Sequence, residues 1–203
     1  MIDKIVKKIH RNYYWYIQER FFQDYIFIHI NKTGGTSIEK ALRLPLQHKT
    51  ALNKKKYLGE NLWKKKFSFA FVRNPWDKVV SHYTYRLRTN QMDILEKKVD
   101  FYNWVRLTYL EKDKKYYDNP KMFMPQLDWI SDENGKILVN YVGKFENFES
   151  DFNEICSHIN IFVSLPHLKK SNRTHYKDYY NSETAEIVGE FFKDDIQYFN
   201  YQF

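Results

Sequence analysis

The sequence is most informative between residues 25 and 37, which read Tyr25-Ile26-Phe27-Ile28-His29-Ile30-Asn31-Lys32-Thr33-Gly34-Gly35-Thr36-Ser37. A short apolar run ends in a small, polar, glycine-containing loop, and a helix-compatible segment follows at once. A strand, a tight loop and a helix in this order present backbone N–H groups and a helix N-terminus to an anion. Lys32 adds a positive charge, and Thr33, Thr36 and Ser37 add hydroxyl donors. We therefore expect this loop to hold a phosphate or a phosphate-like group.

A second polar motif follows the apolar run Phe67–Val72. This run predicts a strand that delivers Arg73 at its carboxyl end, and the helix after it places Asp77 and Ser81 on one face. Arg73 offers a planar fork suited to a phosphate, and Ser81 can donate a hydroxyl hydrogen. The alternative is that Arg73 pairs with a carboxylate while Ser81 only packs. Together the two motifs favour a ligand that carries two separated phosphate groups.

Strands and helices alternate along the chain, which predicts an α/β fold with a central, mostly parallel sheet flanked by helices. The strand candidates are Tyr25–Ile30, Phe67–Val72 and Ile137–Val142. The helix candidates are Thr36–Leu42, Pro75–Arg88, Phe101–Glu111, Phe148–His158 and Glu183–Phe192. The stretch Asn53–Lys66, with six lysines, is expected to be a solvated, partly helical surface. Ligands of such sheets usually bind beyond the carboxyl ends of the strands, where both polar motifs fall.

The bulk composition fits one globular domain with an aromatic core. The chain has 203 residues, 43% of them hydrophobic and 19% aromatic, so disorder is not expected. The formal net charge of +8 favours anionic ligands. Cys156 is the only cysteine and is expected to be a buried small apolar residue. With no possible internal disulfide and no apolar run of membrane-spanning length, we expect a cytoplasmic protein.

Residues 1–24 predict a basic amphipathic helix outside the domain formed by residues 25–203. We expect this helix to pack on the domain. The alternative is a helix that binds a membrane surface or a partner, which would make the protein membrane-associated.

Two other classes of protein compete with the phosphate-loop interpretation. The loop is not a Walker A motif, because Lys32 precedes the glycines instead of following them, and no carboxylate for a phosphate-bound magnesium ion stands out. An ATP-dependent kinase is therefore disfavoured, and no metal is expected. The second rival is a basic protein that binds nucleic acid or anionic glycans without catalysis.

The two motifs resemble the 5′-phosphosulfate loop and the 3′-phosphate motif of sulfotransferases, most closely the carbohydrate branch that includes heparan sulfate 2-O-sulfotransferase and small bacterial relatives. Many members have proline where this chain has Asn31. The segments Val142–Phe148, Leu165–Asn172 and Asp194–Tyr201 also resemble later segments of the family. The resemblance covers most of residues 25–203 and implies a P-loop-like sulfotransferase domain.

The resemblance implies 3′-phosphoadenosine 5′-phosphosulfate as the donor, with adenosine 3′,5′-bisphosphate as the product and no metal. The residues implied around the 5′-phosphosulfate are Lys32, Thr33, Gly34, Gly35, Thr36 and Ser37. Arg73 and Ser81 would hold the 3′-phosphate. Lys169, Lys170 and Ser171 would close over the 3′-phosphate or the adenine, or else form a solvated loop. The implied acceptor is a hydroxyl of a carbohydrate or glycolipid, and nucleic acid is not an expected partner.

The implied chemistry needs a base for the acceptor hydroxyl, and Lys32 as a cation beside the leaving group. His48 is our candidate for the base, because carbohydrate sulfotransferases place a histidine between the two nucleotide motifs. His29 and His82 are expected to have structural roles, whereas His167 and His175 could contact the acceptor.

Weaker candidates complete the set. Glu60 and Glu146 are the alternative bases. An acceptor loop is expected over Asp113–Gln126. Four aromatic residues could stack on rings of the ligands, although core packing is the simpler expectation for the first of them: Trp76, Trp129, Tyr116 and Tyr117.

Overall fold

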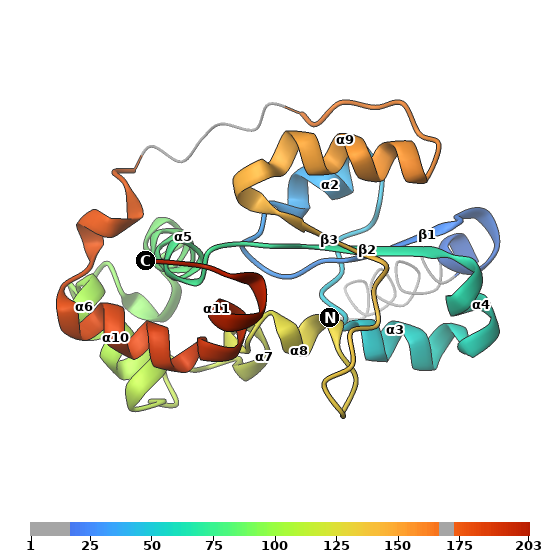
Figure 1. Ribbon diagram of the computed structural model, residues 1–203. Helices are drawn as coiled ribbons and strands as arrows, with labels where there is room; N and C mark the ends of the chain where they lie inside the picture. The colour runs from blue at the N-terminus through green and yellow to red at the C-terminus, as the bar shows by residue number, and fades with distance from the viewer. Residues whose placement is uncertain (1–16, 167–172) are drawn as a thin grey trace, which may run out of the picture. The chain divides into compact units, whose positions relative to one another are not determined.

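A computed structural model describes residues 17–166 and 173–203 (Figure 1). The helix expected over residues 1–24 lies largely outside these ranges, and its described end is the short π-helix η1, Gln18–Phe22. The described residues form two compact units, one made of residues 17–72 and 128–166 and the other of residues 73–127 and 173–203.

The first unit holds a parallel sheet and the helices on its two faces. Its further elements are β1 (Tyr25–Ile28), α2 (Gly35–Ala41), α3 (Ala51–Leu58), α4 (Glu60–Lys65), β2 (Phe67–Val72), β3 (Tyr141–Lys144), η4 (Phe145–Asn147) and α9 (Phe148–His158). The short helix α8 (Leu127–Ile130) lies where the chain passes from the second unit back to the first.

Within the described residues the sheet has three strands in the order β1-β2-β3, all parallel. Phe27 of β1 pairs with Phe69 of β2, which in turn pairs with Tyr141 of β3. All four residues of β1 are buried, as expected for a strand covered on both faces. The predicted parallel α/β fold is thus confirmed.

The third strand begins later than the sequence predicted. A turn over residues 132–135 folds the chain back, so that Ile137 forms an antiparallel bridge with Ser131. The parallel pairing with β2 then starts at Tyr141 instead of Ile137. The prediction Ile137–Val142 joined two short extended segments that the structure uses differently.

Helices cover both faces of this sheet. In Figure 1, α2 and α9 lie on one face and α3 and α4 on the other. Phe69 and Phe71 of β2 pack with Ile38 of α2 and with Phe152 and Cys156 of α9. Cys156 is buried as expected, and burial raises the pKa of its thiol. The sheet is therefore fixed by large apolar side chains on the α2 and α9 side.

The lysine-rich stretch Asn53–Lys66 is only partly the solvated surface that was expected. It forms α3 and α4, but the side chain of Lys54 is 3% exposed. The Lys54 ammonium donates to the carboxylate of Glu19 and, at 2.9 Å, to the carbonyl oxygen of Phe27 in β1. Lys66 is also buried, and its ammonium donates to the carbonyl oxygen of Gln23. These two lysines anchor the sheet.

The second unit is helical. Its elements are α5 (Pro75–Arg88), η2 (Gln91–Asp93), α6 (Phe101–Val105), η3 (Arg106–Leu110), α7 (Pro120–Phe123), η5 (Tyr176–Tyr179), α10 (Ser182–Phe191) and α11 (Lys193–Phe199). Helix α5 has the predicted bounds, with Pro75 in its first turn and the Asn74 side chain accepting from the Trp76 N–H. The helix predicted over Phe101–Glu111 is the α-helix α6 continued by the π-helix η3.

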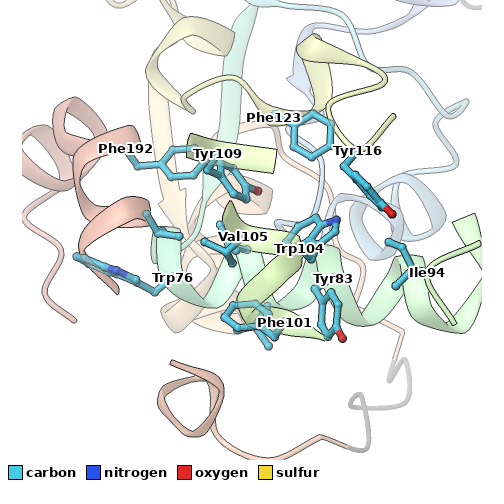
Figure 2. Packing of buried hydrophobic residues seen from close by; sticks show 13 residues of the cluster. Trp76, Tyr83, Ile94, Phe101, Trp104, Val105, Tyr109, Tyr116, Phe123 and Phe192 are labelled. Carbon is cyan, nitrogen blue, oxygen red and sulfur yellow. The ribbon is translucent and has the colours of Figure 1, made fainter. Parts of the chain in front are cut away.

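Aromatic side chains dominate the core of the second unit (Figure 2). Trp104 is fully buried and contacts Tyr109 edge to face, with 5.7 Å between the ring centroids. Tyr83 and Phe101 form a similar pair at 5.3 Å. Aromatic pairs in this geometry stabilise a core beyond their buried area. Among the described residues, none of the helices has the length and apolarity needed to cross a membrane.

Lys54→Met should destabilise the protein by about 3–5 kcal/mol, because it leaves Glu19 as an uncompensated buried charge. The matched control is Lys56→Met on the same helix, where the side chain is 62% exposed and its ammonium pairs with the exposed Glu133. The control should change the free energy of unfolding by less than about 0.5 kcal/mol. Urea unfolding of the three proteins measures both values, and equal effects of the two substitutions would contradict the role given to Lys54.

Candidate functional site

The loop between β1 and α2 turns through two residues in left-handed backbone, Lys32 with φ of 67° and Gly34 with φ of 84°. Gly34 is suited to this conformation because it has no side chain, and a Cβ there would lie 2.7 Å from the ring of Phe148. Gly35 is needed for a different reason. A Cβ at Gly35 would lie 2.1 Å from the imidazole ring of His29. The two consecutive glycines therefore allow a tight turn and a close ring contact.

The side chains of the loop divide into inward and outward groups. Thr33 is buried, and its hydroxyl donates to the carbonyl oxygen of Ile30 at 2.9 Å, so this hydroxyl shapes the loop. Ser37 is also buried, and its N–H donates to the carbonyl oxygen of Gly34 at 2.9 Å. Lys32 is partly exposed and Thr36 exposed. A bound anion would thus meet Lys32, Thr36 and the backbone before the other hydroxyls.

His48 lies in the segment between α2 and α3, beside the end of β1. Its Nδ1 atom is 3.0 Å from the carbonyl oxygen of His29. A carbonyl oxygen only accepts, so Nδ1 carries the hydrogen, and Nε2 is the basic nitrogen of the neutral ring. The rings of His29 and His48 lie 4.3 Å apart, and Trp129 contacts the His48 ring edge to face at 6.1 Å. His48 therefore has the tautomer that a general base acting through Nε2 requires.

His29 and Glu39 form a buried pair behind this loop. The His29 Nδ1 atom is 2.7 Å from Oε1 of Glu39, and both side chains are less than a tenth exposed. His29 is a packed structural residue, as the sequence predicted. Trp129 is fully buried, so its role is packing and not stacking on a ligand.

In the second unit, Arg73 and Asp77 form a close ion pair. The Nε and NH2 groups of Arg73 donate to Oδ2 of Asp77 at 2.8 and 2.6 Å, and the other Asp77 oxygen accepts from Arg173. This pairing is the alternative that the sequence left open for Arg73, and phosphate binding by Arg73 stays a prediction. Ser81 is partly exposed, one helical turn beyond Asp77 on α5.

The side-chain amide of Gln126 bonds both backbone polar groups of Arg73. Its Oε1 accepts from the Arg73 N–H at 2.9 Å, and its Nε2 donates to the Arg73 carbonyl oxygen at 2.8 Å. Buried Asp195 accepts from the N–H groups of Gln126 and Leu127 at 2.7 and 2.9 Å. Burial raises the pKa of Asp195, and these donors oppose the rise. Gln126 thus belongs to the core, at the end of the segment expected to bind the acceptor.

The buried Lys78 side chain interacts electrostatically with the carboxylate of Asp195. Burial lowers the pKa of the Lys78 amine to about 8, and the attraction of Asp195 offsets part of this effect. The Lys78 ammonium also lies 5.1 Å from the centre of the Phe192 ring. Helices α5 and α11 therefore contribute opposite charges to the interior that supports Arg73.

The other candidate residues lie in or against the core of the second unit, at the start of η5, or outside the described residues. Trp76 and Tyr116 are buried in the core of the second unit, and Tyr117 packs against it. His82 is buried and contacts Arg86, as expected for a structural residue. His175 accepts from the Lys177 N–H at the start of η5. The remaining candidates lie outside the described residues, and these are His167, Lys169, Lys170 and Ser171.

The alternative bases are less suited than His48. Glu60 is bonded to Lys55 and Lys64, and the hydrogen bond from Lys55 lowers the pKa of the Glu60 carboxyl, which weakens it as a base. Glu146 is exposed in η4, the short helix that follows β3. Arg173 was not selected from the sequence, although its place directly after the basic segment 165–172 was a signal.

The family of the chain follows from comparison with known proteins. A model of the Sulfotransferase family matches residues 17–202, and the chain belongs to this family. It is therefore a sulfotransferase, an enzyme that transfers sulfuryl groups. An uncharacterized protein of Archaeoglobus fulgidus is 28% identical over 105 residues, which span 51% of this chain and 76% of the relative. A sulfotransferase of Alicyclobacillus acidocaldarius of known structure is 12% identical with a TM-score of 0.48, covering 86% of this chain and 93% of that protein.

Gly35→Ala should destabilise the loop, because the new methyl group would overlap the His29 ring, and overpacking of this kind costs about 1–3 kcal/mol. Gly189→Ala in α10 is the matched control, since a Cβ there meets Trp76 at an ordinary 3.4 Å and alanine favours the helix. Thermal unfolding should show a lower midpoint for Gly35→Ala only. An unchanged midpoint for Gly35→Ala would show that the ring contact does not constrain residue 35.

Proposed function

We propose that this enzyme transfers the sulfuryl group of 3′-phosphoadenosine 5′-phosphosulfate to a hydroxyl of a carbohydrate or glycolipid. The observation that carries the proposal is the loop between β1 and α2. Lys32 lies in its left-handed turn, three residues before Gly35, the first residue of α2, and the N–H groups of Gly35 and Thr36 have no acceptor within the helix. This arrangement suits the phosphosulfate group of the donor, which carries negative charge on both sulfate and phosphate.

Each motif takes one anionic end of the donor in this proposal. Residues 32–37 bind the 5′-phosphosulfate, mainly through Lys32, Thr36 and backbone N–H groups. Arg73 and Ser81 bind the 3′-phosphate, and Arg173 joins them because it shares Asp77 with Arg73. The basic segment Lys169, Lys170 and Ser171 closes over the 3′-phosphate or the adenine.

The proposed reaction is an in-line displacement at sulfur. The acceptor oxygen forms a bond to sulfur while the bond from sulfur to the bridging phosphate oxygen breaks. The hydroxyl proton passes to Nε2 of His48, and the electron pair of the broken bond remains on the leaving phosphate. Lys32 and the loop N–H groups stabilise the negative charge that grows on the leaving oxygen. No metal takes part in these steps.

The acceptor class rests on the resemblance of the paired motifs to carbohydrate sulfotransferases. We also propose that the protein is cytoplasmic. The alternative is a protein that contacts a membrane through residues 1–24. Screening candidate glycans and glycolipids with isotopically labelled donor, read out by mass spectrometry, would identify the acceptor and the position that receives the sulfuryl group.

Calorimetric titration with adenosine 3′,5′-bisphosphate tests donor binding. Lys32→Ala and Arg73→Ala should each weaken binding about 10-fold or more, because each removes a charged hydrogen-bond donor worth about 1.5–3 kcal/mol. Lys40→Ala and Arg88→Ala, which remove exposed charges on α2 and α5, are the controls and should bind like the wild type. Equal weakening by all four substitutions would indicate non-specific attraction to a basic surface, and preference for ATP with magnesium would indicate a kinase.

His48→Ala should leave the affinity for adenosine 3′,5′-bisphosphate nearly unchanged while lowering turnover about 10²–10⁴-fold, the usual contribution of a general base. The measurement is labelled-sulfate transfer to the acceptor found in the screen. His158→Ala, which removes an exposed histidine at the end of α9, is the control and should retain activity. Full activity of the His48→Ala variant would eliminate His48 as the base.

A further inference from the structure

We propose that Glu39 is a positioning residue, which holds His48 in place and in its Nδ1–H tautomer through two hydrogen bonds made by one carboxylate oxygen. This inference rests on the proposed function, because it matters for catalysis only if His48 is the base.

The first link joins Glu39 to the segment that carries His48. Residues 44–50 form neither helix nor strand, so the position of His48 depends on bonds made by this segment. Oε1 of Glu39 accepts from the N–H of Gln47, the residue directly before His48, at 3.1 Å. Glu39 is 6% exposed, and a bond made away from water is not readily replaced by solvent.

The second link passes through His29. The same Glu39 oxygen is 2.7 Å from the His29 Nδ1 atom, and the His29 carbonyl oxygen is the acceptor for the His48 Nδ1–H at 3.0 Å. The His29 ring also stacks on Phe27 and packs against Gly35, which leaves it little freedom. Glu39 therefore fixes the residue whose backbone selects the tautomer of His48.

The other charged groups near Glu39 have partners of their own. A small cavity is lined by Glu39, His29, Gln47, Lys54 and Glu19, among others. Lys54 donates to Glu19 and to the carbonyl oxygen of Phe27. The contacts of Glu39 with His29 and Gln47 are therefore separate from the Lys54 pair, and a substitution at residue 39 addresses the His48 segment.

The tautomer of His48 is directly measurable and needs no acceptor. An unconstrained neutral histidine favours the Nε2–H form, whereas the structure gives His48 the Nδ1–H form. Long-range proton–nitrogen NMR spectra of the full chain, labelled with ¹⁵N, distinguish the two forms at pH 8. Comparison with His48→Ala assigns the His48 signals.

In the wild type, Nδ1 of His48 should show the shift of a protonated nitrogen and Nε2 that of an unprotonated one. Glu39→Ala should move both signals toward the Nε2–H form, because the segment and the His29 carbonyl lose their anchor. Glu39→Gln should stay close to the wild type, since an amide oxygen can still accept from Gln47. Glu149→Ala, which removes an exposed carboxylate on α9, should leave the His48 signals unchanged.

An Nε2–H form of His48 in the wild type, or unchanged His48 signals in a folded Glu39→Ala protein, would overturn the proposal. If Glu39→Ala does not fold, Glu39→Asp is the second variant, because it shortens the reach of the carboxylate by one methylene. Its His48 signals should also move toward the Nε2–H form. Titration of the same samples with adenosine 3′,5′-bisphosphate separates the two claims. Absence of binding in the wild type defeats the donor assignment, whereas the tautomer result decides the role of Glu39.

Discussion

The contact between the His29 ring and the backbone of Gly35 constrains how the chain of the first unit passes from β1 into α2. Strand β1 ends at Ile28, and the chain must reverse within a few residues to begin α2 at Gly35. The ring of His29 fills the space that a Cβ at residue 35 would occupy. Because the ring is also bonded to Glu39 of α2, the strand, the loop and the helix are fixed together. The shape of the loop between β1 and α2 and the place of His48 both follow from this arrangement.

In the second unit, polar side chains likewise fix the position of one cation, the guanidinium of Arg73. The backbone of Arg73 is held by the amide of Gln126, and its guanidinium by the carboxylate of Asp77. A guanidinium with a fixed plane loses less freedom when it binds a phosphate than a mobile one. Asp77 also brings Arg173 to the same place, so that one carboxylate orients two cations. In both units, residues of the proposed site are held by other residues of the same unit, His48 by the Glu39–His29 pair and Arg73 by Gln126 and Asp77.

The sequence predicted the elements whose signals are local. Strands β1 and β2 are nearly continuous apolar runs, and α5 begins at Pro75 after the N-cap Asn74, so their positions could be predicted. The burial of Lys54 could not be predicted, because its partner Glu19 lies 35 residues away and no pattern in α3 marks it. Gln126, which is 53 positions from Arg73, was missed for the same reason. The inward hydroxyl of Thr33 and the tautomer of His48 depend on carbonyl oxygens whose directions only the fold determines.

The central claim is that the loop between β1 and α2 binds the sulfate-bearing end of the donor. A crystal structure with adenosine 3′,5′-bisphosphate bound tests this claim most directly. The account predicts that oxygens of the 5′-phosphate lie within hydrogen-bonding distance of the Gly35 and Thr36 N–H groups and of the Lys32 ammonium. A well-ordered nucleotide whose 5′-phosphate lies away from residues 32–37 would contradict it.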